Sequence, residues 1–296
     1  MIRRFLPALL LVTVALASGC IVRTLRIPRH GAPSGQLATA TLEELVGKVS
    51  AWDQQLHTIN ATVNLEPSVG SVNKGEIDEY KEIRGFVLIR KPGMFRIIGL
   101  LPVVGSRIFD MVTDGKEFKA HFPTKNKMVV GKNNMERPST RKLENIRPQH
   151  LYDALVVRPI AADERAVLEN HTDEAEASYI VHVLVGRGAN LVLARNLWFD
   201  RVGLRLSRQI IFDVKGNIVT DARYEDYKVA HGIAFPHTIT ITRPMDEYGV
   251  KLTVQKLELN KDMDDDKFFL TIPPGTEVMD LEKVDTQKPA GKSGVK

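Results

Sequence analysis

Hydrophobic and polar positions repeat with two different periods in the first part of the chain. Between Leu42 and Trp52, apolar residues recur at helical spacing. Thr41 precedes this stretch and Glu44 follows three residues later, which is the arrangement of a helix capping box. From Thr58 to Leu65, apolar and polar residues alternate one by one, as in a strand with one buried face. The pattern therefore predicts a helix followed by a strand.

Alternation with a period of two continues through most of the chain. Breaks rich in Pro, Gly, Asp and Asn separate the alternating stretches about every 8–12 residues, which is the spacing of an antiparallel meander. Residues 215–217 (Lys-Gly-Asn) predict a hairpin turn, whereas the polar residues 67–79 predict a loop. Within 250–259 the apolar residues change parity, so we expect a β-bulge near Gln255 and Lys256.

These stretches predict about a dozen strands and two or three short helices in one unit that spans residues 41–281. The second helix is expected after Arg147, where Leu151, Ala154 and Leu155 share one face. An antiparallel sheet with this many strands curls, and its concave face must then be filled. We therefore predict a mainly β fold with a curved antiparallel sheet and an apolar cavity lined by Val, Ile, Leu and Phe.

Residues 1–19 have the layout of a secretory signal peptide. A basic start precedes an apolar run of ~13 residues, whereas a membrane-spanning helix needs roughly 20. Small residues then precede Cys20, the only cysteine of the chain. This arrangement resembles the bacterial lipoprotein lipobox, although Ala17 stands where leucine is usual. The resemblance implies a covalent N-terminal lipid on Cys20; the alternative is an ordinary signal peptide that leaves a free thiol.

The expected lipid anchor predicts a location at a membrane, and the two ends of the chain are predicted to be flexible. Three acyl chains exceed the two anchors that stable membrane attachment requires. Ile21 follows the cysteine in place of aspartate, which by resemblance favours an outer-membrane lipoprotein facing the periplasm and leaves inner-membrane placement open. Residues 20–40 lack a sustained period and predict a flexible tether, and the charged residues 282–296 predict a disordered tail.

Composition and motifs argue against several functions. The formal charge of +5 falls by two, to +3, when Arg3 and Arg4 leave with the signal peptide, and this charge is too diffuse for nucleic acid. Asp262, Asp264 and Asp266 have the opening spacing of a calcium loop, but its glycine and glutamate are missing. The histidines show no metal-ligand spacing, and no nucleophile, phosphate-loop or dinucleotide motif is present. We expect no enzyme activity, no metal site and no cofactor besides the lipid.

The order of several short motifs resembles the LolA/LolB-like lipoprotein carrier superfamily. The motifs are Arg-Lys-Pro-Gly at 90–93, Asp114-Gly115 with Phe118, Pro123 with Asn126, and Phe235-Pro236 with Ile239 and Ile241. Each motif alone is turn chemistry, and their order over residues 41–281 carries the resemblance. It implies an incomplete, half-open β-barrel with a helical lid, which holds acyl chains without covalent chemistry.

Two features are candidate contacts. A strand connection carries four apolar residues, which form either a buried hairpin end or, as in the LolB-like receptors, an exposed loop that touches a membrane or an incoming lipid: Leu100, Leu101, Val103 and Val104. Arg96 lies within an apolar strand. It either faces water by alternation or bonds a carbonyl of the lid, as an arginine does in the carriers.

The leading hypothesis is a membrane-anchored lipoprotein that binds the acyl chains of lipoproteins or lipids in its cavity, for trafficking within the cell envelope. The alternative is a non-catalytic structural or interaction subunit of an envelope assembly or transport complex, in which the interior of the sheet is filled. The expected partners are the membrane, through the anchor, a lipidated protein or lipid ligand, and an envelope protein. Nucleic acid is not an expected partner.

Overall fold

The strands of this protein form one open β-sheet, whose two edge strands do not pair with each other. The computed structural model describes residues 36–71, 75–133, 146–173 and 176–284. The predicted signal peptide, Cys20, most of the tether and the tail from residue 285 lie outside the described residues.

Fifteen strands form one sheet, in the order β15-β7-β6-β5-β4-β3-β1-β14-β13-β12-β11-β10-β9-β8, with β2 paired to β1. Their bounds are β1 Thr58–Ser71, β2 Glu76–Glu79, β3 Ile83–Arg90, β4 Met94–Leu100, β5 Arg107–Thr113, β6 Glu117–Phe122, β7 Lys127–Lys132, β8 Arg165–Thr172, β9 Ala177–Val185, β10 Val192–Asp200, β11 Leu206–Phe212, β12 Ile218–Ala230, β13 Ile233–Arg243, β14 Tyr248–Leu259 and β15 Glu277–Asp280.

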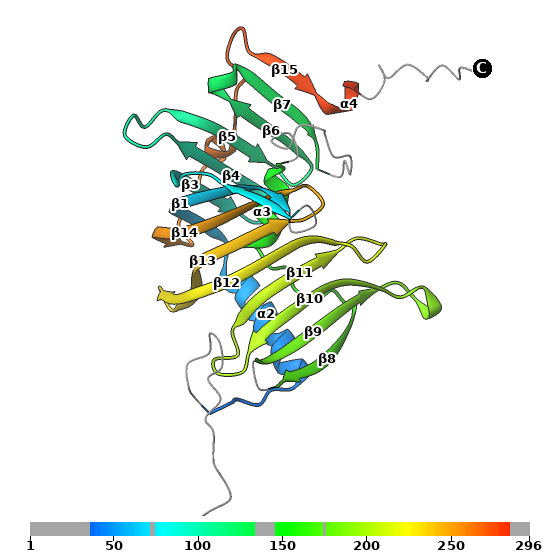
Figure 1. The fold of residues 1–296 in the computed structure, drawn as a ribbon. Coiled ribbons are helices and arrows are strands. Elements are labelled where there is room, and N and C mark those ends of the chain that lie inside the picture. The colour runs from blue at the N-terminus through cyan, green and yellow to red at the C-terminus, as the bar shows by residue number, and fades with distance from the viewer. Residues whose placement is uncertain (1–35, 72–74, 134–145, 174–175, 285–296) are drawn as a thin grey trace, which may run out of the picture.

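The two edge strands, β8 and β15, lie at opposite ends of the sheet and do not meet (Figure 1). Neighbouring strands are antiparallel, except that β15 pairs with β7 in parallel. The prediction of a mainly β fold with a curved, half-open sheet is confirmed.

Two helices cover one face of the sheet, which we call the inner face. Helix α2 (Leu42–Gln55) has the predicted capping box, in which the Thr41 side chain accepts from the Glu44 amide and Glu44 accepts from the Thr41 amide. Helix α3 (Pro148–Leu155) begins with proline, whose missing N–H costs nothing at a helix start. Figure 1 shows α2 crossing the strands from β8 toward β12. The short helix α4 (Leu281–Val284) follows β15.

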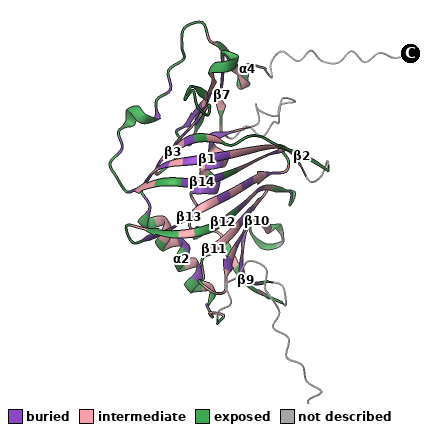
Figure 2. Ribbon diagram, turned by 60° about the vertical axis from the view of Figure 1, so that its left-hand side comes forward, coloured by how far each residue is buried: buried purple, intermediate pink, exposed green. Residues whose placement is uncertain are grey.

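The hydrophobic core lies between these helices and the inner face. Alternate residues of the central strands point inward, and most are almost fully buried: Ile59, Ala61, Val63 and Leu65 of β1, Val87 and Ile89 of β3, and Ile239 and Ile241 of β13. Figure 2 shows the buried residues concentrated along these strands and exposed residues in β2. Burial of the inner face, at about 25 cal/mol per Å² of apolar surface, is therefore the main stabilising term.

Two local predictions can be compared with the strand register. The predicted β-bulge is confirmed: the register of β1 and β14 shifts where Thr62 pairs with Lys256 and Val63 pairs with Val254. The predicted loop at 67–79 is wrong in part, because β1 extends to Ser71 and pairs with β2. All four residues of β2 are exposed, so this hairpin extends beyond the core and has no apolar alternation to reveal it.

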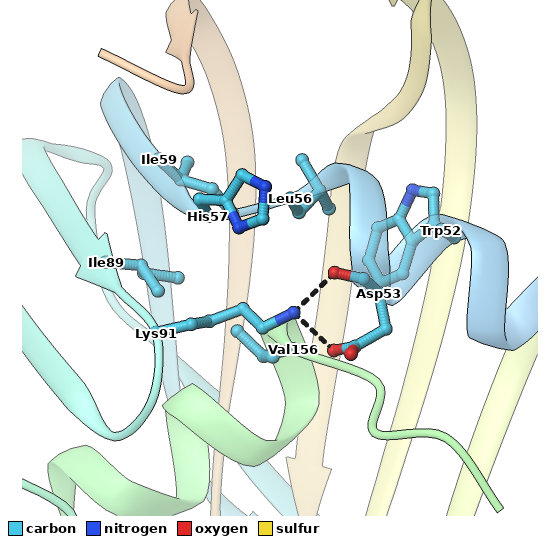
Figure 3. Close-up of a pocket in the computed structure, with 8 residues that line it drawn as sticks. All are labelled: Trp52, Asp53, Leu56, His57, Ile59, Ile89, Lys91 and Val156. Atoms are coloured by element: carbon cyan, nitrogen blue, oxygen red, sulfur yellow. Dashed lines mark hydrogen bonds and ion pairs between the residues drawn. The ribbon is translucent and has the colours of Figure 1, made fainter. Parts of the chain in front are cut away.

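The turn between β3 and β4 contacts both helices, and Figure 3 shows its contact with α2. The Lys91 ammonium lies 2.5 Å from both the carbonyl and the carboxylate oxygen of Asp53, at the end of α2. The Gly93 amide donates to the Tyr152 hydroxyl of α3 at 2.9 Å. This turn therefore holds both helices against the same end of strands β3 and β4.

Segment 260–276, between β14 and β15, crosses the other face of the sheet, which we call the outer face. Arg90 donates to the Met263 carbonyl and pairs with Asp265. Leu270 packs against Val112 and Met128, the outward-facing residues of β5 and β7. This crossing segment carries the chain from the middle of the sheet to its far edge, where β15 pairs with β7.

His150 connects α3 to strands β13 and β14. Its Nε2 atom is 3.2 Å from an Arg243 nitrogen, and its Nδ1 atom is 3.2 Å from the Tyr248 hydroxyl. Burial lowers the pKa of His150 well below its usual value, and the charges of Arg243 and Arg147 lower it further. The Asp246 carboxylate lies 3.9 Å from Nδ1 but is held by Arg243 at 2.7 Å. The imidazole is therefore neutral in the folded protein.

We predict that this buried imidazole makes stability depend on pH. The unfolded chain binds a proton at His150 below about pH 6.5, whereas the folded protein does not, so the free energy of unfolding falls as pH falls, by at most ~1.4 kcal/mol per pH unit. Urea unfolding at pH 7 and pH 5 measures the loss. His150→Gln is expected to reduce it, whereas the exposed His57→Gln leaves it unchanged; equal losses in both variants would contradict the prediction.

Candidate functional site

An apolar groove lies between α2 and the inner face of the sheet. It holds a volume of about 350 Å³, within the range of roughly 300–1,000 Å³ that small-molecule sites occupy. We call it the α2 groove. Its apolar and aromatic lining comes from α2, the strand ends of β10–β13 and the segment after α3: Val49, Ala51, Trp52, Val157, Phe199, Leu204, Leu206, Tyr224, Tyr227 and Ala234.

Trp52 fixes one wall of the α2 groove. Its indole nitrogen donates to the Ala234 carbonyl at 3.1 Å, and its ring stacks on Phe235, with ring centroids 6.3 Å apart. Val49, one turn earlier, is buried against the sheet. The helix is therefore held against β13 along this side, and the groove opens on the side facing β10–β12.

The turn between β10 and β11 forms the opposite rim. The Asp200 carboxylate accepts from the amides of Val202, Gly203 and Arg205 at 2.6–3.0 Å. These bonds hold Leu204 in the left-handed conformation, with φ of 51°, which is uncommon for a residue with a branched side chain. Strained residues of this kind persist only where the surroundings fix them. Here the strain places Leu204 in the groove lining.

The chain enters the described fold at this same turn. The Ala38 amide donates to the Arg201 carbonyl at 2.6 Å, and the Arg201 guanidinium donates back to the Ala38 carbonyl. The guanidinium also lies over the Tyr179 ring. The segment that precedes α2 is therefore held beside the rim of the α2 groove.

The apolar hollow is smaller than the sequence predicts. Over the central strands β1, β3, β13 and β14, the space beneath Leu155 of α3 amounts to only about 10 Å³, enough for at most one water molecule. Helix α3 and the core side chains fill this region. A further hollow of about 460 Å³ lies beside the crossing segment. Four carboxylates line it, and these do not suit an acyl chain: Asp114, Glu117, Asp280 and Glu282.

The predicted apolar loop protrudes from the sheet. Val103 is fully exposed, Val104 is 77% exposed and Leu101 is 38% exposed, whereas Leu100, at the end of β4, is half-buried. Val103 has a φ of 71°. This left-handed conformation is a clear outlier for a β-branched residue. The loop thus exposes three apolar side chains at a conformational cost, and its contact with a membrane or lipid stays a prediction.

Arg96 does not contact the helices in the way the sequence suggested. Its neighbour Phe95 points inward to Tyr152 of α3, with ring centroids 6.4 Å apart, so Arg96 lies on the outer face. Its guanidinium binds both oxygens of the buried Asp110, at 2.9 and 2.7 Å, and donates to the Lys267 carbonyl at 2.8 Å. The side chain is only 13% exposed, so Arg96 neither faces open water nor bonds α2 or α3, and it contacts the crossing segment instead.

No group of three metal-ligating side chains is present in the described part of the chain. Among the same residues, no helix is long and apolar enough to span a membrane. Cys20, the predicted lipidation site, lies outside them.

Comparison with known proteins places the fold. No family model matches the chain, and no curated protein matches it in sequence. A DUF1329 family protein from Desulfovibrio piger has a TM-score of 0.51 and 11% identity, over 76% of this chain and 94% of that one. A LolA superfamily protein from Nitrosomonas europaea has a TM-score of 0.49 and 14% identity, over 78% and 99%. The likeness to the DUF1329 family protein concerns the fold alone, and the expected resemblance to the lipoprotein carriers stays an expectation.

We predict opposite effects on stability for two neighbouring glycine substitutions in the loop. Val103→Gly relieves the left-handed backbone and is expected to raise the free energy of unfolding by about 1 kcal/mol. Val104→Gly has no such strain to relieve, and the added backbone entropy of the unfolded chain lowers the free energy by roughly 0.5–1 kcal/mol. Urea unfolding measures both variants. Changes of the same sign would contradict the strain argument.

Proposed function

We propose that this protein binds the acyl chains of lipids or lipidated proteins in the α2 groove and takes part in lipid or lipoprotein trafficking in the cell envelope. The observation that carries the proposal is the groove itself: an open volume of about 350 Å³ between a helix and a curved sheet, lined mainly by apolar and aromatic side chains. Such a site accepts a flexible chain with little directional demand.

The energetics suit this role. Each buried methylene contributes ~0.8 kcal/mol, so roughly ten methylenes supply ~8 kcal/mol before the costs of association. Micromolar binding corresponds to about 8 kcal/mol. Because the cost of association offsets part of the ~8 kcal/mol, a single acyl segment of this length gives binding that is weaker than micromolar and reversible, with no covalent step. The proposed role is non-catalytic and uses no cofactor.

The proposed location is the cell envelope, with the protein held on a membrane by a lipid on Cys20. The sequence before Cys20 supports the anchor, and the resemblance of the motifs in residues 41–281 to the lipoprotein carriers supports an envelope role. The exposed loop with Leu101, Val103 and Val104 is proposed to contact the bilayer or the incoming ligand.

The filled centre of the inner face favours a second candidate function. A sheet whose central strands leave only about 10 Å³ free beneath α3 also suits a non-catalytic interaction subunit of an envelope assembly. Native mass spectrometry of the Cys20→Ala chain separates the two functions. Acyl lipid that co-purifies, or that binds on titration, supports the carrier. A protein that binds no acyl ligand and forms a stable complex with an envelope protein supports the interaction subunit.

We predict that a large side chain on the groove side of α2 blocks acyl binding. Ala51 lines the groove and is exposed, so Ala51→Trp fills the opening without disturbing the core. Titration of the Cys20→Ala chain with cis-parinaric acid is expected to show binding at least tenfold weaker, a change of about 1.4 kcal/mol. Gln54→Trp adds the same side chain at an exposed position of α2 that does not line the groove, and serves as the control. Equal affinities of the two tryptophan variants would remove the α2 groove from the proposal.

We predict that charge in the apolar loop reduces lipid transfer. Val103→Glu places a carboxylate at the most exposed apolar position, where contact with hydrocarbon would require its desolvation. Transfer of a fluorescent phospholipid between vesicles, measured with the Cys20→Ala chain, is expected to slow several-fold. The control is Val214→Glu, which changes another exposed valine, in the β11–β12 turn. Unchanged transfer by Val103→Glu would show that the loop is not the contact.

A further inference from the structure

The charged residues of the α2 groove all have the same sign. Among the side chains that line it, only Lys48 and Arg205 are charged, and no carboxylate lines it. Lys48 lies on α2 and Arg205 on the β10–β11 turn, so they approach the opening from its two sides. Both side chains are exposed. The groove therefore combines an apolar interior with a cationic rim.

Neighbouring carboxylates are engaged elsewhere. Asp200, in the same turn as Arg205, uses its oxygens to accept backbone amides of that turn. Glu44, one helical turn before Lys48, accepts from the Thr41 amide at 2.8 Å. The nearby Asp226 pairs with Lys228 at 3.0 Å. Within the described residues, neither Lys48 nor Arg205 has a carboxylate within ion-pair distance.

Arg205 is held at the rim by an aromatic ring. Its guanidinium carbon lies 5.5 Å from the centroid of Tyr227, which itself lines the groove. The Tyr227 hydroxyl donates to the Leu206 carbonyl at 2.7 Å, which fixes the ring. A cation stacked on a ring keeps its N–H donors available at the ring edge. The guanidinium is thus positioned for an anion at the opening of the groove.

These observations identify a class of ligand. We propose that the α2 groove selects an amphiphile with an anionic phosphate or carboxylate head group, whose acyl chain lies in the groove and whose head group contacts Lys48 and Arg205. The inference rests on the proposed acyl-binding function and narrows it. Charge-assisted hydrogen bonds from two cations stabilise an anionic head, whereas a zwitterionic head places its own cation beside them. An uncharged head gains nothing from either residue.

Displacement of bound cis-parinaric acid from the Cys20→Ala chain tests the proposal. The probes are dodecyl phosphate and dodecylphosphocholine, used below their micellar concentrations, and inorganic phosphate. Dodecyl phosphate is expected to bind about tenfold more tightly than dodecylphosphocholine, which is the effect of one charge-assisted contact. The preference is expected to decrease with salt, because exposed charges are screened. Inorganic phosphate alone is expected to leave the fluorophore bound.

Variants connect this preference to the two cations. Lys48→Gln with Arg205→Gln is expected to abolish the preference for dodecyl phosphate while retaining dodecylphosphocholine binding, which shows that the groove is still folded. Arg223→Gln removes an exposed arginine that does not line the groove and is expected to keep the preference.

Each remaining outcome rejects a stated part of the proposal. Equal binding of the two dodecyl probes by the unsubstituted groove, or a preference that survives in the double variant, overturns the head-group assignment and leaves acyl binding intact. Displacement of the fluorophore by inorganic phosphate alone would show that Lys48 and Arg205 bind a free anion, and would also overturn the head-group assignment. Failure of cis-parinaric acid and both dodecyl probes to bind rejects the acyl-binding function itself.

Discussion

Covering the inner face of an open sheet is the constraint on which the structure depends. A sheet that does not close leaves its apolar face in water unless other elements bury it, and this chain supplies two helices for the purpose. Helix α3 lies over the centre and leaves almost no free volume. Helix α2 crosses the strands toward β8 and packs on the sheet through Leu45, Val49 and Trp52. The α2 groove is the space that remains between this helix and the neighbouring strands.

Alternation of apolar and polar residues predicts the parts of the fold that bury one face. The capping box of α2, the strands from Thr58 onward and the bulge in β14 follow from local pattern alone. The pattern does not predict the hairpin of β1 and β2, because all residues of β2 are exposed. Alternation also does not predict strand β15, which has only four residues. Its parallel pairing with β7 depends on the path of segment 260–276 across the outer face, which is a long-range feature.

The candidate site is less visible in the sequence than the fold. Its lining comes from segments separated by more than a hundred residues. In the sequence, the aromatic residues of the lining cannot be distinguished from aromatic residues of the core. The left-handed backbone of Leu204 is set by bonds to Asp200 within a turn that the sequence does not single out, whereas the stacking of Arg205 on Tyr227 is set by a tertiary contact. Arg96 shows the reverse case: its place in the strand is predictable, but its partner, Asp110, depends on the register of β4 and β5.

The position of Trp52 allows occupancy of the groove to be followed by tryptophan fluorescence. The chain has two tryptophans, and Trp52 lines the groove. The other, Trp198, points away from the inner face and lies beneath the Arg208 guanidinium, 5.2 Å from ring centroid to carbon. Indole emission depends on the polarity around the ring, so replacing water in the groove with hydrocarbon alters one chromophore and spares the other. The protein therefore contains its own spectroscopic reporter of occupancy, without any attached dye.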